Sequence, residues 1–318
     1  MIVTVTLNAA LDVAYDVAGV SWESDSEVSR VRYRAGGRGV AVARVLHKFG
    51  HDVVAAGLAG GAAGEMIRED LARSGIPGAF THIAGESRRV LAITDTARGG
   101  RTARFREPGP YVTTEELGRF AADYRRLLAD AAAVVLCGSL PAGLPPEIYG
   151  SLASWASEAG VPVILSAGGR ALWHGAARRP GLVIPDAVSP GAAGPVPGAA
   201  GPEAGAGGLP LPGAGADAVL LGLGAAAVAI PADRGVRAVT AAGQWSAWLV
   251  SGEAPGSQGA LVAGLVPGLL LGWSWPDRLR HALAVAVAAD ESGEVDLAVY
   301  ESLLDAVRVE QAAGLTSP

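Results

Sequence analysis

Disulfide bonds are excluded first, because the 318-residue chain contains a single cysteine, Cys137. One cysteine cannot form an internal disulfide, and sparing cysteine use is typical of proteins from reducing compartments. The residues before it, Ala133-Val134-Val135-Leu136, form an apolar run that predicts a buried strand. We therefore expect a cytoplasmic protein whose cysteine is packed, not nucleophilic.

Long hydrophobic runs are also missing. The longest, from Ala260 to Trp273, is shorter than the ~20 residues of a membrane-spanning helix and contains Pro267. The segment from Met1 to Leu7 is β-like with no basic residues, so we expect a soluble protein without a signal peptide. The net charge of −6 gives no overall basic field, which disfavours nucleic acid and anionic membrane as partners.

Lysine and metal-binding patterns are scarce as well. Lys48 is the only lysine, and arginine supplies the other 24 of the 25 basic residues, a bias that indicates a GC-rich genome. The five histidines show no ligand spacing, because Gly50 predicts a helix end between His47 and His51. We expect no histidine-based metal site.

Short β-branched runs alternate with amphipathic segments, which predicts a mostly parallel sheet with helices on both faces. The expected strands are 1–7, 52–57, 132–137, 162–166, 181–184 and 217–222, with a polar strand pair around 236–250. The expected helices are 38–50, 62–74, 114–129, 146–159, 259–272, 276–290 and 297–309. Two antiparallel hairpins, 12–17 with 28–35 and 89–96 with 101–106, are expected to form a small projecting sheet.

One segment has a composition that cannot form a core. Between Pro190 and Ala214, 21 of 25 residues are Gly, Ala or Pro, which predicts a loop. The chain shows no internal repeat. We therefore expect one domain over 1–318 with an embedded low-complexity loop at 190–214.

Five local motifs follow one another along the chain: Thr4 to Asp12 (TVTLNAALD), Ala35 to Leu46 (AGGRGVAVARVL), Gly60-Gly61 with Gly64, Glu107 to Pro110 (EPGP), and Gly138 to Gly143 (GSLPAG). In this order and spacing they resemble the ribokinase-like (PfkB) carbohydrate kinase family, in its 1-phosphofructokinase and tagatose-6-phosphate kinase branch. Each motif alone is weak, and the glycines at 36–39 could serve only a tight strand-to-helix turn. The resemblance extends, with gaps, to about residue 290.

The resemblance implies an α/β fold, a three-layer αβα sandwich with a mostly parallel central sheet and a small β lid formed by about 12–35 and 88–107. It implies a sugar phosphate held between lid and sheet, ATP along the carboxyl-terminal half, and a homodimer joined through the lid. The substrate-binding positions that it implies are Asp12, Gly36, Gly37, Arg38, Arg88 and Glu107.

The main departure from the family lies at its Gly-Ala-Gly-Asp turn, where the aspartate takes the proton of the acceptor hydroxyl. The aligned segment is Gly256-Ser257-Gln258-Gly259, so the base position is Gly259 and no catalytic residue is assigned. The backbone of this turn could still form an anion hole at a helix start. Glu253, the nearest carboxylate in sequence, precedes the turn on the wrong side.

Gly222 and Gly224 are candidates for the nucleotide side. They lie in the segment from Leu221 to Ala227, which is similar to the family's Ser-Leu-Gly-x-x-Gly-Ala strand without its polar residues. A core strand is the plainer interpretation of this segment.

Other family positions are altered too. The magnesium-organising Asn-x-x-Glu element aligns with Asp186 and Ser189, which leaves Asp186 a weak metal candidate and no metal site assigned. Genome bias explains lysine replaced by Arg38, but not the family lysines replaced by Ile184 and Ala92. Val90 and Ala41 stand where the family has asparagine.

Four tryptophans, Trp245, Trp248, Trp273 and Trp275, are concentrated in the carboxyl-terminal third. Packing is the default explanation, although aromatic rings could also fill a vacated adenine cleft or line a new apolar pocket or protein interface.

These departures favour a degenerate PfkB-type homologue that lacks normal ATP-dependent phosphoryl transfer. It would act as a binding or regulatory protein for a sugar-like or phosphorylated small molecule, or would have been recruited to other chemistry at the sugar site. The alternative is an active sugar or sugar-phosphate kinase, a phosphotransferase with an alcohol acceptor, in which Glu253 or Asp186 serves as the base. ATP and Mg²⁺ are expected as cofactors only in that alternative.

Overall fold

The computed structural model describes residues 1–318 except 22, 98, 187–215, 233, 251–255 and 313–318. The expected loop at 190–214 and the candidate positions Ser189 and Glu253 lie outside the described residues.

Within the described residues, ten strands form the main sheet, and most of them pair in parallel. They are β1 (Ile2–Thr6), β4 (Val53–Gly60), β5 (Gly78–Ile83), β8 (Ala133–Cys137), β9 (Val163–Ala167), β10 (Leu182–Pro185), β11 (Ala227–Ala232), β12 (Gly235–Thr240), β13 (Gly243–Leu249) and β14 (Val307–Ala312). Their order is β14-β13-β12-β11-β10-β9-β8-β1-β4-β5, parallel from β5 to β11 and antiparallel from β11 to β14. Strands such as β8 are apolar throughout because both of their faces are buried.

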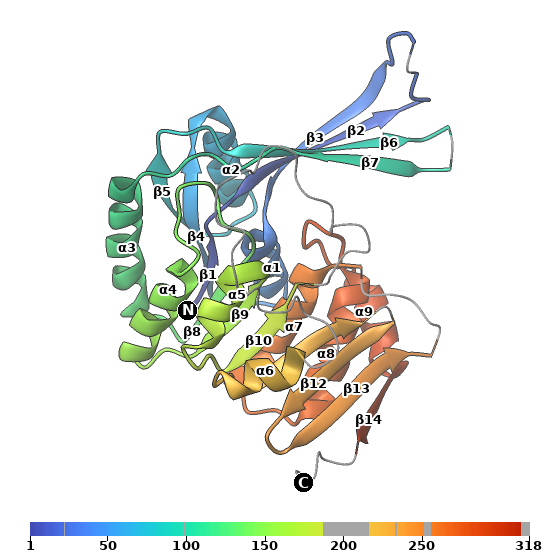
Figure 1. Ribbon diagram of the computed structural model, residues 1–318. Helices are drawn as coiled ribbons and strands as arrows, with labels where there is room; N and C mark the ends of the chain where they lie inside the picture. The colour runs from blue at the N-terminus through green and yellow to red at the C-terminus, as the bar shows by residue number, and fades with distance from the viewer. Residues whose placement is uncertain (22, 98, 187–215, 233, 251–255, 313–318) are drawn as a thin grey trace, which may run out of the picture.

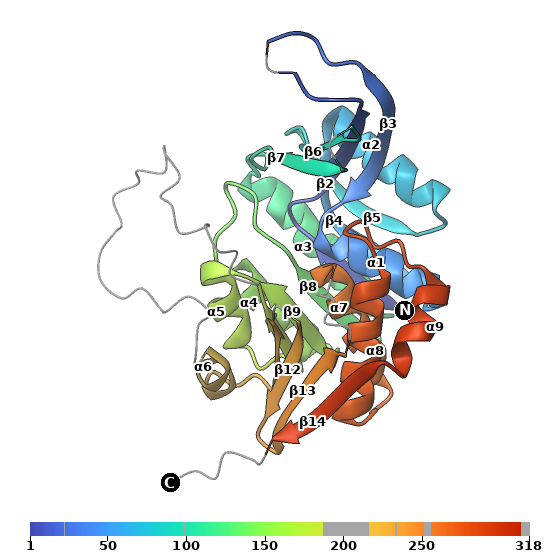
Figure 2. The same cartoon turned by 90° about the vertical axis from the view of Figure 1, so that its right-hand side faces the viewer.

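Helices cover both faces of this sheet (Figures 1 and 2). One face carries α1 (Arg38–Lys48), α2 (Gly61–Arg73), α7 (Gln258–Leu270), α8 (Trp275–Ala288) and α9 (Leu297–Leu304). The other carries α3 (Thr114–Leu128), α4 (Ile148–Glu158), α5 (Gly169–Ala176) and α6 (Ala216–Gly222). Each layer encloses its own apolar core, so the fold is a three-layer αβα arrangement.

A second sheet of four strands, the lid, projects from the main body (Figure 1). It consists of β2 (Ala10–Val17), β3 (Val28–Gly36), β6 (Arg88–Asp95) and β7 (Arg101–Arg106), in the order β3-β2-β6-β7. The antiparallel pairs β2–β3 and β6–β7 are the two hairpins that the sequence predicts, and β2 pairs with β6 in parallel. Only Leu7, Asn8 and Ala9 separate β1 from β2, so the lid begins where the central strand ends.

The predicted strand at 217–222 is wrong, because these residues form helix α6. A short apolar run does not distinguish a strand from a buried helix. In the structure Leu220 is buried under the sheet while Val219 is 38% exposed. The interpretation of Leu221 to Ala227 as a core strand is wrong for the same reason: the chain turns at Gly224 and enters β11 only at Ala227.

The predicted helix at 297–309 is too long. Helix α9 ends at Leu304, and β14 then pairs with β13 as an edge strand. The strand β5 and the helix α5, which starts in the Gly168-Gly169 pair, were not predicted.

Three of the four carboxyl-terminal tryptophans have aromatic partners. Trp245 of β13 stacks on Trp275 of α8 with ring centroids 5.8 Å apart, and Trp273 meets His281 edge to face at 5.4 Å. The packing explanation therefore applies to these three. Across the part of the chain that is described, no helix is both long and apolar enough to cross a membrane.

Candidate functional site

The strand order reverses at β1, which has β4 and β5 on one side and β8, β9 and β10 on the other. In open parallel sheets such a switch point leaves a crevice beyond the carboxyl ends of the two central strands. Here those ends lead into Asn8, after β1, and Ser139, after β8. Asn8 Nδ2 donates a hydrogen bond to Ser139 Oγ at 3.1 Å, so the two loops meet in the crevice.

The side chain of Asn8 has an oxygen atom that can still accept a hydrogen bond. Its side chain is buried, and within the described residues its Oδ1 atom has no hydrogen-bond partner. Arg88, at the start of β6, donates from Nε to the Asn8 backbone carbonyl at 3.3 Å. A buried amide oxygen without a partner is costly unless a ligand or water donates to it. Sequence reasoning did not select Asn8 as a site residue, although its place directly after an apolar strand is such a signal.

Asp12 lies in the second strand of the lid, directly over Gly36. A Cβ atom added to Gly36 would come within 2.3 Å of the Asp12 carboxylate, so the carboxylate keeps this position only above a glycine. Burial raises the Asp12 pKa to about 6, and the nearby Arg88 opposes this shift. A half-buried carboxylate held against bare backbone is suited to accept hydrogen bonds from ligand hydroxyl groups.

The start of helix α1 is packed tightly against β1. Gly37 caps the helix with φ 107°, and a Cβ atom there would lie 2.7 Å from Thr6 Cγ2. A Cβ atom on Gly39 would lie 2.4 Å from Thr6 Oγ1. The glycines therefore bring the amino end of α1 to the crevice, with its partial positive charge next to Asn8 and Asp12.

Arg38 crosses from α1 to the ends of β9 and β10. It donates from Nη1 to the Ser166 carbonyl at 3.2 Å and forms an ion pair with Asp186. The weak metal candidate Asp186 thus neutralises the cation that the resemblance assigned to the substrate. Among the described residues, no group of three or more His, Cys, Asp or Glu side chains could hold a metal ion.

The turn before α7 satisfies most of its own polar groups. The amides of Gly256 and Ser257 both donate to the Ala286 carbonyl, at 3.0 and 3.3 Å. Ser257 Oγ accepts from the Ala260 amide at 3.2 Å, which caps the helix. The Gln258 side chain donates to the Pro185 carbonyl at 3.1 Å. Within the described residues, the backbone amides of Gln258 and Gly259 have no acceptor, so only these two amides of the expected anion hole could donate to a ligand.

Gly259 lies against another altered position. A Cβ atom added to it would be 3.0 Å from Ala41 Cβ and 3.4 Å from the Arg38 carbonyl. Ala41 and Gly259 stand where the resemblance expects asparagine and aspartate. Two small residues therefore face each other at the point where polar side chains are expected.

Three remaining candidates have structural partners. Glu107 accepts from the Arg89 amide at 2.7 Å and thereby closes the end of the β6–β7 ladder. Gly222 ends α6 and Gly224 lies in the turn before β11, where the Ala226 amide donates to the Pro180 carbonyl just before β10. That is the amino-terminal edge of the sheet, opposite the crevice. Gly222 and Gly224 therefore lie away from the crevice in which Asn8 and Asp12 meet.

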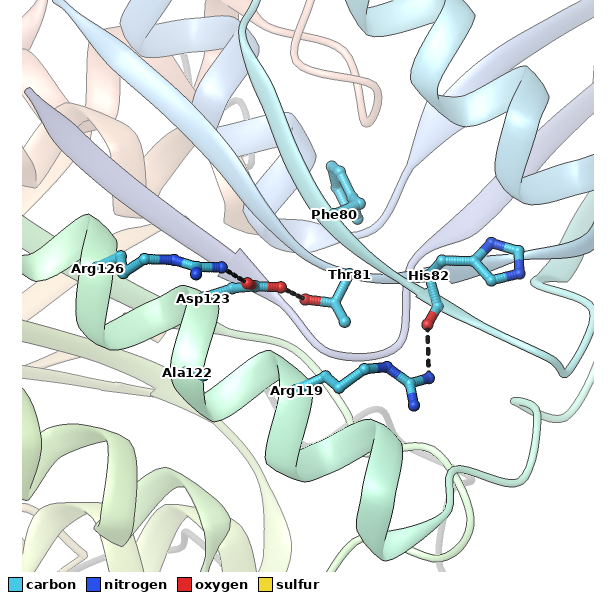
Figure 3. Close-up of a pocket in the computed structure, with 7 residues that line it drawn as sticks. All are labelled: Phe80, Thr81, His82, Arg119, Ala122, Asp123 and Arg126. Atoms are coloured by element: carbon cyan, nitrogen blue, oxygen red, sulfur yellow. Dashed lines mark hydrogen bonds and ion pairs between the residues drawn. The ribbon is translucent and has the colours of Figure 1, made fainter.

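A surface hollow lies away from this crevice, between β5 and α3 (Figure 3). Its polar groups bond to each other: Asp123 accepts from Thr81 at 2.5 Å and pairs with Arg126, and Arg119 donates to the His82 carbonyl at 3.3 Å. The sequence motifs do not extend to it.

The sheet, the lid and the crevice between them define a ribokinase-like α/β fold. The sequence pattern of the "pfkB family carbohydrate kinase" matches residues 5–179, more than half of the chain. The chain belongs to the pfkB family of carbohydrate kinases.

Individual relatives agree with this assignment. Tagatose-6-phosphate kinase of Staphylococcus epidermidis is 36% identical over 172 residues, which are 54% of this chain and 54% of that protein. The match thus spans about half the length of that curated relative. A possible 1-phosphofructokinase of Thermotoga maritima superposes with a TM-score of 0.80 at 24% identity, covering 98% of this chain and 99% of that one. Phosphofructokinase-2 of Escherichia coli in complex with fructose-6-phosphate gives 0.78 at 21%, covering 96% and 98%.

Proposed function

We propose that this chain binds a sugar-like or phosphorylated small molecule in the crevice around Asn8 and Asp12 and lacks normal ATP-dependent phosphoryl transfer. It would act as a binding or regulatory protein, or carry out other chemistry on the same ligand. The observation that carries the proposal is Gly259, which lies at the start of α7 against Ala41 without a carboxylate. A positioned general base contributes roughly 10²–10⁴-fold to proton-transfer catalysis, and backbone cannot replace it.

The hydrogen bonds of the turn support this proposal. Amides that stabilise charge in a transition state must be free to reach it. The amides of Gly256 and Ser257 are instead bonded to Ala286, and Arg38 is paired with Asp186. The turn thus offers two amides and no free side-chain cation among the residues named here.

The polar groups around Asn8 and Asp12, which we call the sugar side of the crevice, support the proposal that a ligand binds there. Asn8 Oδ1 has no partner among the described residues, and the desolvated Asp12 faces Gly36. These groups can accept hydrogen bonds from the hydroxyl groups of a polyol. The names of the S. epidermidis and E. coli relatives point to phosphorylated sugars as the first ligands to try.

A homodimer through the lid is part of the proposal. Val31 and Tyr33 of β3 and Phe105 of β7 are 44%, 46% and 53% exposed. Tyr33 pairs with Val13, Val13 with Leu91, and Leu91 with Phe105, so Tyr33 and Phe105 lie at the two ends of one apolar row across the lid. The middle residues of this row, Val13 and Leu91, pack against the protomer's own core. Phosphofructokinase-2 of E. coli has been solved in a tetrameric inhibited form, which supports this part of the proposal.

A ligand-shift screen with and without ATP tests the proposal. Fructose 6-phosphate, tagatose 6-phosphate and fructose 1-phosphate are added to the purified protein while its melting temperature is followed. We expect a sugar phosphate to raise the melting temperature, and MgATP to add nothing. A large shift with MgATP alone, with none from any sugar phosphate, would contradict the proposal.

The second candidate function is an active carbohydrate kinase in which Asp186 is the base. One observation favours it: Asp186 follows Pro185, whose carbonyl accepts from Gln258 at the phosphate turn. Asp186→Asn would then abolish ATP-dependent turnover, whereas Asp130→Asn, an exposed carboxylate after α3, would leave it unchanged. Without any turnover in the unmodified protein, this candidate fails.

A further inference from the structure

Strand β5 and helix α3 form one edge of the molecule, at the left of Figure 1, whereas the lid projects to the right. Among the described residues, β5 is the last strand of the main sheet on this side. The Pro77 carbonyl accepts from the Ala55 amide of β4, and successive residues of a strand direct their backbone groups to alternate sides. Phe80 and His82 therefore point theirs away from β4, and such an open strand edge can pair with another chain.

Helix α3 is fastened beside this strand and runs antiparallel to it. In the first turn of the helix, Glu116 Oε1 accepts from the Ala84 amide, just after β5, at 2.7 Å. Further along the helix, Asp123 accepts from Thr81 in the middle of β5 (Figure 3). Strand and helix thus form one surface, with the hollow of about 640 Å³ between them.

The outer face of α3 is flat in its middle. Gly118 and Ala122, one turn apart, are both exposed. A Cβ atom added to Gly118 would have no atom within 4 Å, so nothing in the same chain packs there. Small side chains let two helices approach to about 8 Å between their axes. This face can therefore receive another helix at close range.

The charged side chains of α3 alternate in sign along the helix. In chain order they are Glu115, Arg119, Asp123 and Arg126, apart from the buried Glu116 and from Arg125, which lies over the Trp155 ring. When two copies of α3 lie antiparallel, Glu115 faces the partner's Arg126, and Arg119 faces the partner's Asp123. All four contacts then join opposite charges, whereas parallel copies would set like charges against each other. The face is complementary to itself in one orientation.

The present ion pairs of these residues do not prevent such contacts. Glu115 pairs with Arg119, and Asp123 with Arg126, within the same helix. The outermost groups, Glu115 and Arg126, are 86% and 76% exposed, so they can turn toward a partner. Exposed pairs contribute little affinity, and their part is to select the antiparallel orientation.

We propose that a second copy of this chain docks on the edge formed by α3 and β5, around a twofold axis that sets the two α3 helices antiparallel. The same axis sets the two β5 strands antiparallel, edge to edge, where the outward backbone groups of Phe80 and His82 meet those of the partner. Affinity comes from burying the hollow and from these backbone bonds. This interface is separate from the lid and does not depend on the proposed function.

Sedimentation equilibrium tests the interface in a Tyr33→Ser/Phe105→Ser background, which removes the exposed apolar groups of the lid. We expect this background protein to form a dimer over about 1–100 μM, the range of a moderate protein interface. Adding Gly118→Gln should weaken association at least 10-fold, because the side chain has room within one chain but holds two helices apart. Gly222→Gln is the matched control, since Gly222 also has no atom within 4 Å, and should leave the dimer unchanged.

A charge exchange across the interface gives a result that a folding defect cannot produce. Glu115→Arg and Arg126→Glu should each weaken association about fivefold, because each sets like charges together at both ends of the interface. The double variant restores opposite charges and should associate within about twofold of the background. It does so although both changes oppose the dipole of α3 and destabilise the helix.

Three results would overturn the proposal: a background protein that remains monomeric up to about 100 μM, an unchanged dissociation constant in Gly118→Gln, or a double charge variant that associates no better than the single ones.

Discussion

The two ends of the crevice differ in how their polar groups are satisfied. On the sugar side, Asn8 Oδ1 has no partner among the described residues and Asp12 is held, desolvated, over bare backbone. At the turn before α7, Gly256, Ser257 and Gln258 all bond to neighbouring carbonyls. A buried polar atom without a partner calls for an explanation, and a ligand that bonds to it is one. The sugar side therefore has a buried side-chain acceptor without a described partner, whereas the turn keeps only the backbone amides of Gln258 and Gly259 without one.

The largest expected effect on ligand affinity comes from changing a glycine to alanine on the sugar side of the crevice, with the same change at the turn before α7 as the comparison. Gly36→Ala places a methyl group 2.3 Å from the Asp12 carboxylate, so Asp12 must move. We expect sugar-phosphate affinity to fall roughly 100-fold, the loss of one or two hydrogen bonds to a charged group. Titration calorimetry measures the loss.

Gly256→Ala is the matched change at the turn. Its added Cβ atom would have its closest contact at 3.3 Å, with the Ala289 carbonyl. We expect unchanged ligand affinity. Equal losses in the two variants would remove the distinction between the two ends.

Asp12→Asn is expected to stabilise the protein at neutral pH. The Asp12 pKa is about 6 in the folded protein and 3.8 without burial, so the folded state holds the proton more tightly. Stability from this group is therefore greatest below pH 3.8 and is lost as the pH rises to 6. Unfolding titrations should show a gain of about 2 kcal/mol for Asn at pH 7.5, allowing for partial exposure.

That gain should shrink as the pH falls and vanish below pH 3.8, where the Asp12 carboxyl group becomes protonated in the unfolded state as well. Asp16→Asn, at a site paired with Arg32, serves as the comparison and should lose stability instead. A gain independent of pH would show that Asp12 is not desolvated.

For His281, in the carboxyl-terminal half, we expect the stability of the protein to depend on pH with the opposite sign to that for Asp12. Burial lowers its pKa from 6.5 to about 4, and its Nδ1 atom lies 2.8 Å from the Tyr300 hydroxyl. Between pH 6.5 and 4 the unfolded state binds the proton more readily, so stability falls as the pH falls. His281→Gln should flatten the decline by about 1–2 kcal/mol between pH 7 and 5. Chemical denaturation at several pH values measures it, and an unchanged slope would contradict the assignment.

The smallest effect concerns Gly222, the last residue of α6, and Gly224, in the turn that follows. Gly222 has no atom within 4 Å of an added Cβ, so Gly222→Ala should stabilise the helix end by about 0.5 kcal/mol. Gly224 has φ 114° and lies 2.8 Å from Arg179 Cγ, so Gly224→Ala should destabilise. Thermal melts distinguish the two. A change in ligand affinity for either variant would place this segment back at the crevice.

Much of the fold could be predicted from the sequence because its signals are local. The apolar run before Cys137 became β8, and Thr113 with Glu116 forms the capping box that starts α3. Helix α6 and strand β14 could not be predicted, because a short apolar run takes its conformation from its neighbours. Val307 to Ala312 is a strand because β13 offers an edge to pair with.

The candidate site was predictable only in part for a similar reason. Asp12, Gly36 and Arg38 lie in motifs. The structure holds Asp12 over Gly36, but it turns Arg38 to Asp186, beyond the ends of β9 and β10. The arginines of β7 lie outside any motif. The position of Arg106 beside Val90 follows from the strand register. The contact of Arg104 with Glu291 exists only because the fold brings the turn between α8 and α9 to the lid.

The most direct test of the central claim is ADP release by the purified, unmodified protein with MgATP and saturating fructose 6-phosphate, tagatose 6-phosphate or fructose 1-phosphate. With Gly259 in place of a base, and with the amides of Gly256 and Ser257 already bonded, sugar-dependent release should not exceed the rate without sugar. Sustained release that requires both MgATP and the sugar, at a turnover of roughly 1 per second or more, would contradict the account.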